Sequence, residues 1–336
     1  MSAPTLEDVA RLAGVSTASI SRALNTPGKV APATRKRIEK AIETLGYTPN
    51  FGGRALASGR ANTVGAVIPS MANAMFANAL QSFQEALTVE GVNLLVATTG
   101  FDPVQELAAI KSLVAHGAGG LMLIGNDRPD ETWAFLEKRR VPYVIAWSSS
   151  APSGRRFVGF DNAQAAADAA RHALDTGHRR VAMISGRVDG NDRARARRDG
   201  VVAAVRAFGE GARMTHVAQA EYLLDDGGRA FREIMSQKDK PTVVICGNDA
   251  LAAGAMVAAR EMGIDLPQDM SFVGFDDIGL ARVVTPALTT VRVPQNGIGR
   301  EVAGLLLQYL NHEEPGPSVT LETAFVRRAS LVAPRA

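Results

Sequence analysis

Residues 5–25 read Thr-Leu-Glu-Asp-Val-Ala-Arg-Leu-Ala-Gly-Val-Ser-Thr-Ala-Ser-Ile-Ser-Arg-Ala-Leu-Asn. Leu6, Val9, Ala10 and Ala13 recur at spacings of three and four, which predicts a helix with one apolar face. The glycine that follows permits a tight turn, and the apolar residues after it predict a second helix that closes a small core. A helix pair of this size can place its second helix in the major groove of DNA.

Short polar side chains gather at the start of the second predicted helix. Ser16 fits the position of an N-cap, so Thr17, Ala18, Ser21 and Arg22 fall at or near the helix start, where such a helix presents side chains to base edges. The arginine could bind guanine through two hydrogen bonds or hold a phosphate, and both remain open. An ordinary helical hairpin is the alternative.

The charges of the chain are concentrated at its start. Residues 1–60 hold nine Lys and Arg against four Asp and Glu, whereas the remaining 276 residues hold 28 against 30. A basic head on a nearly neutral body is expected of a segment that faces phosphates. A solvated basic surface is the alternative reading of such a bias.

A third amphipathic helix is predicted over residues 32–45, with Ile38, Ile42 and Leu45 on the inner face. Pro32 near its start and Gly46 after its end agree with these bounds. A short candidate helix follows over residues 51–57.

These residues resemble the head of the lactose-repressor/galactose-repressor (LacI/GalR) transcription factors. The resemblance rests on Thr5-Leu6-x-Asp8-Val9-Ala10, Ala13-Gly14-Val15-Ser16, Ser21-Arg22-x-Leu24-Asn25, Gly46-Tyr47-x-Pro49-Asn50 and Leu56. It implies binding to double-stranded operator DNA. The positions that it implicates in this binding are Thr5, Ser16, Thr17, Ala18, Ser21, Arg22, Asn25, Asn50 and Leu56.

The resemblance also implies a hinge after Pro49-Asn50 that becomes helical on DNA. The leucine that matches Leu56 is an apolar wedge in the minor groove. Gly52 and Gly53 depart from the commoner pattern, because each glycine costs about 1 kcal/mol relative to alanine within a helix. We therefore expect the hinge to be disordered without DNA.

From about residue 62 onward, apolar runs alternate with helical patterns. Strands separated by helices indicate parallel sheets covered on both faces, and about 275 residues exceed what one such sheet usually needs. The pattern therefore predicts two subdomains with a cleft between them. The strands are expected at 63–68, 92–97, 120–124, 141–146, 181–185, 242–246 and 271–275, with a last strand-like run over 323–332.

This body resembles the type I periplasmic-binding-protein fold that the same repressors carry as a sensor. We therefore expect an all-α helix-turn-helix domain at 1–49, a hinge helix and linker at 50–61, and an α/β effector-binding and dimerisation domain at 62–336. The latter would consist of two doubly wound parallel-sheet subdomains, with chain crossings near residues 161, 292 and 323. Ligands in such folds bind near the carboxyl ends of the strands.

Several other classes of function find no support in the residues. Cys246 lies in an apolar run and is expected to be a buried, inert thiol, and the five histidines show no metal-ligand spacing. No cofactor is expected, and no nucleophile elbow, Walker loop or dinucleotide fingerprint occurs. Without a signal segment or an apolar run of membrane-spanning length, we expect a cytosolic protein.

Three stretches of the body carry side chains suited to a ligand. Arg193, Arg195, Arg197 and Arg198 fall within 189–200, where a solvated basic face is the alternative. The family pattern Arg-x-Arg-x-x-Gly matches Arg195-x-Arg197-x-x-Gly200, and its second arginine characteristically contacts effector. The family also implies that Asn248 points into the cleft and that Asp276 binds effector. Asp249 is expected to cap a helix and Asp277 to be structural.

Other candidates line the cleft less directly: Ser70 and Phe76 after the first strand, Trp147, and Tyr222. Sugar-binding members often carry aspartate at the position of the tryptophan. A tryptophan there is more similar to the gluconate-repressor branch, whose effectors are sugar acids. Phe76 is as well explained as a core aromatic.

Together these features predict a homodimeric transcriptional regulator, most simply a repressor. Its operator affinity would respond to a sugar, sugar acid or phosphorylated derivative, with no membrane partner. The alternative is a cytosolic sugar-acid-binding protein or enzyme with a vestigial head. Nonspecific nucleoid-type DNA binding would leave the clefted body without a role.

Overall fold

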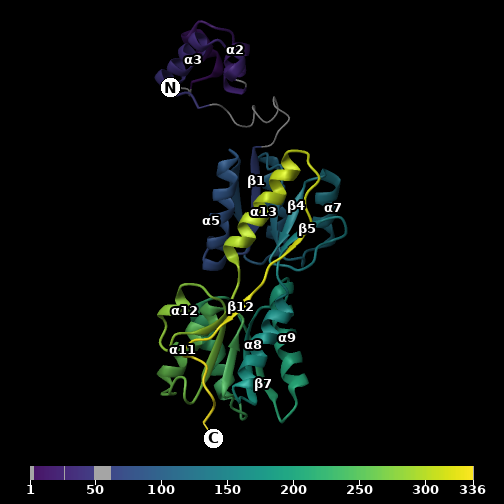
Figure 1. Ribbon diagram of the computed structural model, residues 1–336, viewed down its shortest axis with the longest axis vertical. Helices are drawn as coiled ribbons and strands as arrows, with labels where there is room; N and C mark the ends of the chain where they lie inside the picture. The colour runs from purple at the N-terminus through teal and green to yellow at the C-terminus, as the bar shows by residue number, and fades with distance from the viewer. Residues whose placement is uncertain (1–3, 26, 49–61, 336) are drawn as a thin grey trace. The chain divides into compact units, whose positions relative to one another are not determined.

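The protein is described here by a computed structural model that covers residues 4–25, 27–48 and 62–335. The chain divides into two compact units, Met1–Asn62 and Thr63–Ala336 (Figure 1). The predicted hinge helix at 51–57, with Asn50 and Leu56, lies outside the described residues.

The first unit is a three-helix domain built from α1 (Leu6–Ala13), α2 (Thr17–Asn25) and α3 (Pro32–Leu45), with a short 3₁₀ turn, η1 (Pro27–Lys29). The inward faces of the three helices meet in one small core, as the spacing of apolar residues predicts. The buried members of this core are Val9, Ala10, Ala13, Ile20, Ala23, Ile38 and Ala41.

Local sequence signals set the ends of these helices. Thr5 caps α1 in a reciprocal box with Asp8, which satisfies backbone donors at the helix start. Gly14 and Gly46 end α1 and α3 with φ of 63° and 60°, a left-handed conformation that costs glycine little. The Ser16 hydroxyl accepts a hydrogen bond from the backbone of Ser19 at the start of α2.

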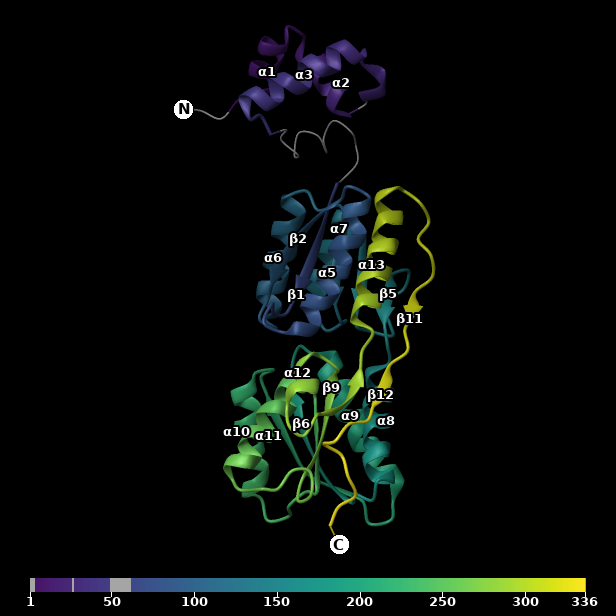
Figure 2. The ribbon, with the colours of Figure 1, turned by 60° about the vertical axis from the view of Figure 1, so that its left-hand side comes forward.

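The second unit contains two six-stranded sheets (Figures 1 and 2). The first sheet is parallel throughout, in the order β11-β5-β4-β3-β1-β2. Helices α5 and α13 cover one face with the largest apolar cluster, and α6 and α7 cover the other. The elements of this subdomain are β1 (Thr63–Ile68), α5 (Ala74–Val89), β2 (Asn93–Thr98), α6 (Pro103–Ala115), β3 (Leu121–Ile124), α7 (Asp130–Arg139), β4 (Tyr143–Ala146), β5 (Arg156–Gly159), α13 (Gln295–Leu310) and β11 (Val319–Thr320).

The second sheet has the order β12-β10-β9-β8-β6-β7 and is parallel except for β12, which runs antiparallel to β10. Helices α8 and α9 pack on one face, and α10 and α11 on the other. The elements of this subdomain are α8 (Asn162–Asp175), β6 (Arg180–Gly186), α9 (Asp192–Phe208), β7 (Arg213–Ala220), α10 (Leu224–Ser236), β8 (Val243–Cys246), α11 (Asp249–Glu261), β9 (Ser271–Asp276), α12 (Leu280–Val283), β10 (Thr289–Arg292) and β12 (Ala324–Val326).

The chain passes between the two sheets three times: between β5 and α8, between β10 and α13, and between β11 and β12. The second passage returns α13 to the first subdomain, where it lies beside α5 (Figure 2). Gly299 permits this close approach, because a Cβ atom there would overlap the carbonyl oxygen of Ala79. Three connections therefore join subdomains that otherwise have separate sheets.

The fold class expected from the sequence is confirmed, but several strand predictions need correction. The run at 323–332 forms a strand only over Ala324–Val326. Beyond it, Arg328 and Ser330 bond instead to the backbone of β9 and of the segment before β10. The sequence prediction also missed β5, β7, β10 and β11. Strand β7 (Arg213–Ala220) lies at a sheet edge and is only partly buried, so its sequence lacks the continuous apolar run of a central strand.

Cys246 is buried on β8, as expected. Within the part of the chain that the structure describes, no helix combines the length and the apolar character that a membrane crossing requires.

Candidate effector site and DNA-reading helix

The cleft between the two subdomains lies at the carboxyl ends of their central strands. In both sheets the strand order reverses direction there, at β2-β1-β3 and at β7-β6-β8, and such points hold ligands in open α/β sheets. A cavity of about 480 Å³ opens between the loops after β1 and β2 and the loop after β7. Its lining is formed by Pro69, Ser70, Met71, Ala72, Asn73, Phe76, Thr98, Gly100, Phe101, Glu221, Tyr222 and Leu223.

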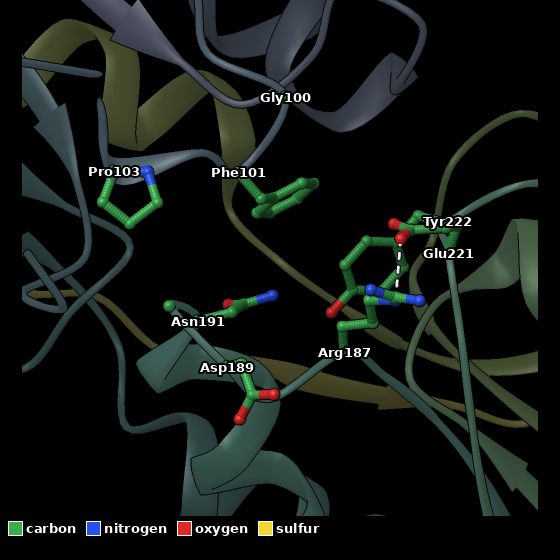
Figure 3. A pocket seen from close by; sticks show the side chains of 9 residues that line it. Gly100, Phe101, Pro103, Arg187, Asp189, Asn191, Glu221 and Tyr222 are labelled. Atoms are coloured by element: carbon green, nitrogen blue, oxygen red, sulfur yellow. Dashed lines mark ion pairs between the residues drawn. The ribbon is translucent and has the colours of Figure 1, made fainter. Parts of the chain in front are cut away.

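A second cavity, of about 290 Å³, shares Gly100, Phe101, Glu221 and Tyr222 with the first. Figure 3 shows Phe101 entering it from one side and Asp189 and Asn191, on the loop before α9, from the other. Phe101 and Tyr222 approach with ring centroids 6.0 Å apart. The two cavities together are large enough for a small organic ligand.

Three of the residues predicted from the sequence line these cavities. Ser70 and Phe76 come from the first subdomain and Tyr222 from the second. The Ser70 hydroxyl accepts a hydrogen bond from the backbone of Ala72, which shapes the loop after β1. Tyr222 packs against Gly186, where a Cβ atom would overlap its ring.

Arg197 and Asp276 lie in a buried cluster and line neither of these two cavities. The guanidinium donates through Nε to Oδ1 of Asn162 (3.0 Å) and through Nη1 to the carbonyl oxygen of Gly247 (2.7 Å). It also lies over the ring of Phe275, 4.3 Å from the centroid, and its Nη1 is 4.0 Å from Oδ1 of Asp276. Arg197 is therefore part of a buried ion pair rather than of a solvated basic face.

The carboxyl group of Asp276 is held in an unusual setting. Burial raises its pKa to about 7, and the charge of Arg197 opposes that shift only in part. Its Oδ1 atom is buried with no hydrogen-bond partner among the described residues. Asp276 and Asp277 both have positive φ, 106° and 52°, and such strain in residues other than glycine gathers at functional sites.

Trp147 directly follows β4, has a φ of 59° and is fully buried. Its ring meets Phe76 edge to face at a centroid distance of 5.2 Å, which joins it to the wall of the larger cavity. Its carbonyl oxygen accepts from Asn162, the same residue that holds Arg197. The indole Nε1 is buried and has no hydrogen-bond partner within the described ranges.

Two neighbouring residues at the start of α11 differ from the roles expected of them. Asn248, expected to point into the cleft, caps α11, since its Oδ1 accepts from the backbone of Leu251 (2.9 Å). Asp249, expected to be that cap, instead accepts from the Thr290 hydroxyl (2.5 Å) and the backbone of Ile278 (2.8 Å). Asn248 is the residue that directly precedes the first helical turn, where a cap side chain reaches back to the free backbone donors.

Asp277 is structural, as expected. Its buried carboxylate pairs with Arg292 (2.8 Å), the last residue of β10, and with Arg328 (2.5 Å), just after β12.

Several residues that face or approach the cleft were missed as ligand contacts. Phe101, Arg187 and Glu221 line the cavities, and the latter two form an ion pair at 2.8 Å. All three follow strands whose carboxyl ends point to the cleft, and that position is the signal that could have identified them. No group of potential metal ligands occurs among the described residues.

In the first unit, Thr17, Ala18 and Arg22 are exposed on α2, and Ser16 is exposed just before it. Ser21 is half-buried, Thr5 caps α1, and Asn25 ends α2. The surface of α2 thus presents small side chains and a cation on one short helix, which suits close approach to base edges and phosphates.

Each of the two units matches a known protein family. Residues 5–50 match the family described as "Bacterial regulatory proteins, lacI family", and residues 170–331 match "Periplasmic binding protein-like domain". The HTH-type transcriptional repressor PurR of Klebsiella pneumoniae (strain 342) is 31% identical over 97% of this chain and 96% of that protein.

Solved structures give the same result. A LacI-family transcriptional regulator from Silicibacter pomeroyi superposes with a TM-score of 0.89, at 26% identity over 98% of this chain and 99% of the other. The lac repressor dimer bound to operator and the anti-inducer ONPF has the same fold, with a TM-score of 0.85 at 24% identity over 99% and 100%. The chain therefore belongs to the lacI family of bacterial regulatory proteins, as a DNA-binding transcriptional regulator and not an enzyme.

Proposed function

We propose that this regulator is a repressor that binds a pseudo-palindromic operator as a homodimer. In this proposal a hydroxylated small molecule of sugar size controls operator affinity from the cleft. Two helix-turn-helix heads on one dimer match two half-sites about one helical turn apart. The lac repressor, which has the same fold, forms such a dimer on its operator.

The observation that carries the effector proposal is a set of buried polar atoms without partners. Oδ1 of Asp276 can accept a hydrogen bond and Nε1 of Trp147 can donate one, and neither has a partner among the described residues. Leaving such a group unpaired costs about 1–3 kcal/mol. Hydroxyl groups of a ligand can donate to the carboxyl oxygen and accept from the indole, and Phe76, which packs on Trp147, lines the larger cavity.

The charges around the cleft favour a neutral sugar over a sugar acid or a phosphorylated derivative. Arg187 is paired with Glu221, and Arg197 faces Asp276. An anionic ligand would have to displace one of these carboxylates or be held beside it. This inference departs from the sugar-acid expectation drawn from Trp147.

A ligand that bridges the subdomains would favour one degree of closure over others. We propose that closure reaches the DNA-binding head through residues 58–62 and the hinge, with the hinge as the element that has two states. Binding at the cleft would then change operator affinity without any contact between effector and DNA.

The test begins with a thermal-shift screen of the full chain against neutral sugars, sugar acids and sugar phosphates. A ligand at about 100 times its Kd should stabilise the protein by about 2.7 kcal/mol. Operator binding is then measured with and without the ligand found, and light scattering gives the oligomeric state.

Asp276→Asn should weaken binding of that ligand at least tenfold. Asp225→Asn, on the exposed surface of α10, is the matched control and should leave it unchanged. If no sugar derivative binds, or if Asp276→Asn keeps full affinity, the effector proposal is wrong.

A further inference from the structure

Two segments from opposite subdomains meet directly across the cleft. One is the turn after β3, at residues 124–127, and the other is the first turn of α9, at residues 192–195. Arg193 Nη1 donates to the carbonyl oxygen of Ile124 (3.1 Å), and the backbone N–H of Asn126 donates to Oδ2 of Asp192 (2.8 Å). We call these two segments the latch.

An ion pair between Arg195 and Asp127, at 2.8 Å, completes the latch at its edge. The arginine side chain is 42% exposed and the aspartate 34%, so this pair borders solvent whereas Arg193 is buried. Charged groups take part in all three contacts, and charge-assisted hydrogen bonds are the stronger ones.

The latch fits together tightly. Gly125 has a φ of 68°, and a Cβ atom there would overlap the guanidinium of Arg193 and the carboxylate of Asp192. A side chain at this position would therefore push the two segments apart. The glycine is needed both for its backbone conformation and for the close approach.

In the first subdomain, Arg128 holds the turn of the latch in place. Arg128 is buried, donates to the carbonyl oxygens of Gly125 (2.7 Å) and Ile124 (3.4 Å), and pairs with Glu106 at 2.9 Å. The turn after β3 is thereby held in one conformation before it meets α9. A preorganised surface loses less conformational entropy when the contact forms.

We propose that the latch holds the cleft closed by protein contacts alone, so that closure is the resting state of this regulator. The three contacts are made entirely by donors and acceptors of the chain, whereas the side-chain Oδ1 of Asn126, in the same turn, is buried and has no partner among the described residues. An effector then biases an equilibrium that already favours the closed form. This proposal concerns the cleft itself and holds whichever effector class binds.

The test measures the width of the cleft in the full chain with no small molecule added. Met71→Cys and Leu223→Cys place spin labels on opposite rims of the same cavity, because both residues are more than half exposed and line it. The native Cys246 is buried, and burial raises the pKa of its thiol, so it should not react with the label. Pulsed electron paramagnetic resonance then measures the distance between the two spin labels.

We expect one short distance in the protein with an intact latch. Two substitutions should each give a longer distance between the labels in at least half of the molecules. Arg195→Glu repels Asp127, and Gly125→Ala separates the two segments. Arg198→Ala is the matched control, because that arginine also lies on α9 but pairs with its neighbour Asp199. Combining Arg195→Glu with Asp127→Arg should restore the short distance.

The proposal is overturned if the intact latch already gives a broad or long distance. It is also overturned if Arg195→Glu and Gly125→Ala fold normally, as judged by tryptophan fluorescence, and keep the short distance. Failure of the reversed pair to rescue Arg195→Glu would show that the pair does not contribute to closure.

Discussion

Replacement of Asp276 by asparagine should change how the stability of the second unit depends on pH. The native carboxyl has a pKa of about 7 because it is buried, whereas its reference value is 3.8. Between these values the folded protein binds more protons at this site than the unfolded chain does. The free energy of unfolding must therefore fall as pH rises through this window.

The size of the effect follows from the two pKa values. One pKa unit corresponds to about 1.4 kcal/mol, so this site should lower the free energy of unfolding by about 2 kcal/mol between pH 5 and pH 7. Above pH 7 the loss levels off, because the folded protein also loses the proton. Asp276→Asn keeps the shape of the side chain but cannot titrate, so it should lack this contribution.

Urea unfolding at several pH values between 5 and 8 provides the assay, followed by tryptophan fluorescence. Both tryptophans, Trp133 and Trp147, lie in the second unit, so the signal reports that unit alone. Burial and the nearby Asp276 also raise the pKa of Asp249, so the difference between the two proteins includes the part of that rise which the charge of Asp276 causes. Parallel stability curves for the two proteins would refute the assignment of a raised pKa to Asp276.

Three further outcomes are expected. Arg22→Ala should weaken operator binding and reduce the slope of log affinity against log salt by about 1 if the arginine holds a phosphate, and an unchanged affinity would remove it from the interface. Arg197→Ala should abolish the response of operator binding to the effector found in the screen while sparing binding without it, and calorimetric titration checks the loss of effector affinity. Gly254→Ala should destabilise the second unit by about 1–3 kcal/mol in urea unfolding, because a Cβ there would overlap the carbonyl oxygen of Leu224. Gly304→Ala is its control, since a Cβ there meets nothing within 4 Å, and it should stabilise α13 by up to about 1 kcal/mol.

The sequence by itself was sufficient for features that depend on near neighbours in the chain. The helices of the first unit follow from apolar residues three and four apart and from caps such as Thr5 and Gly14, whose partners are within a few residues. The central strands of the second unit follow from continuous apolar runs, because parallel strands are buried on both faces. The resemblance of the head to a known family rests on the same short-range pattern.

Only the tertiary structure decided the features that join distant residues. Strand β7 is half-buried at a sheet edge, where polar residues are tolerated and no continuous apolar run is required. Asp249 accepts hydrogen bonds from Thr290 and Ile278 instead of capping α11, because the fold brings those two residues to the start of the helix.

The same is true of Arg197. Its run of charges is compatible with a solvated surface, and it becomes a buried ion pair because the fold places Asp276 and Gly247 beside it. The latch likewise joins residues more than sixty positions apart. Periodicity and local propensity report which face of an element is buried, but the partner of a buried charge is set by how the sheets pack and where the chain crosses between them.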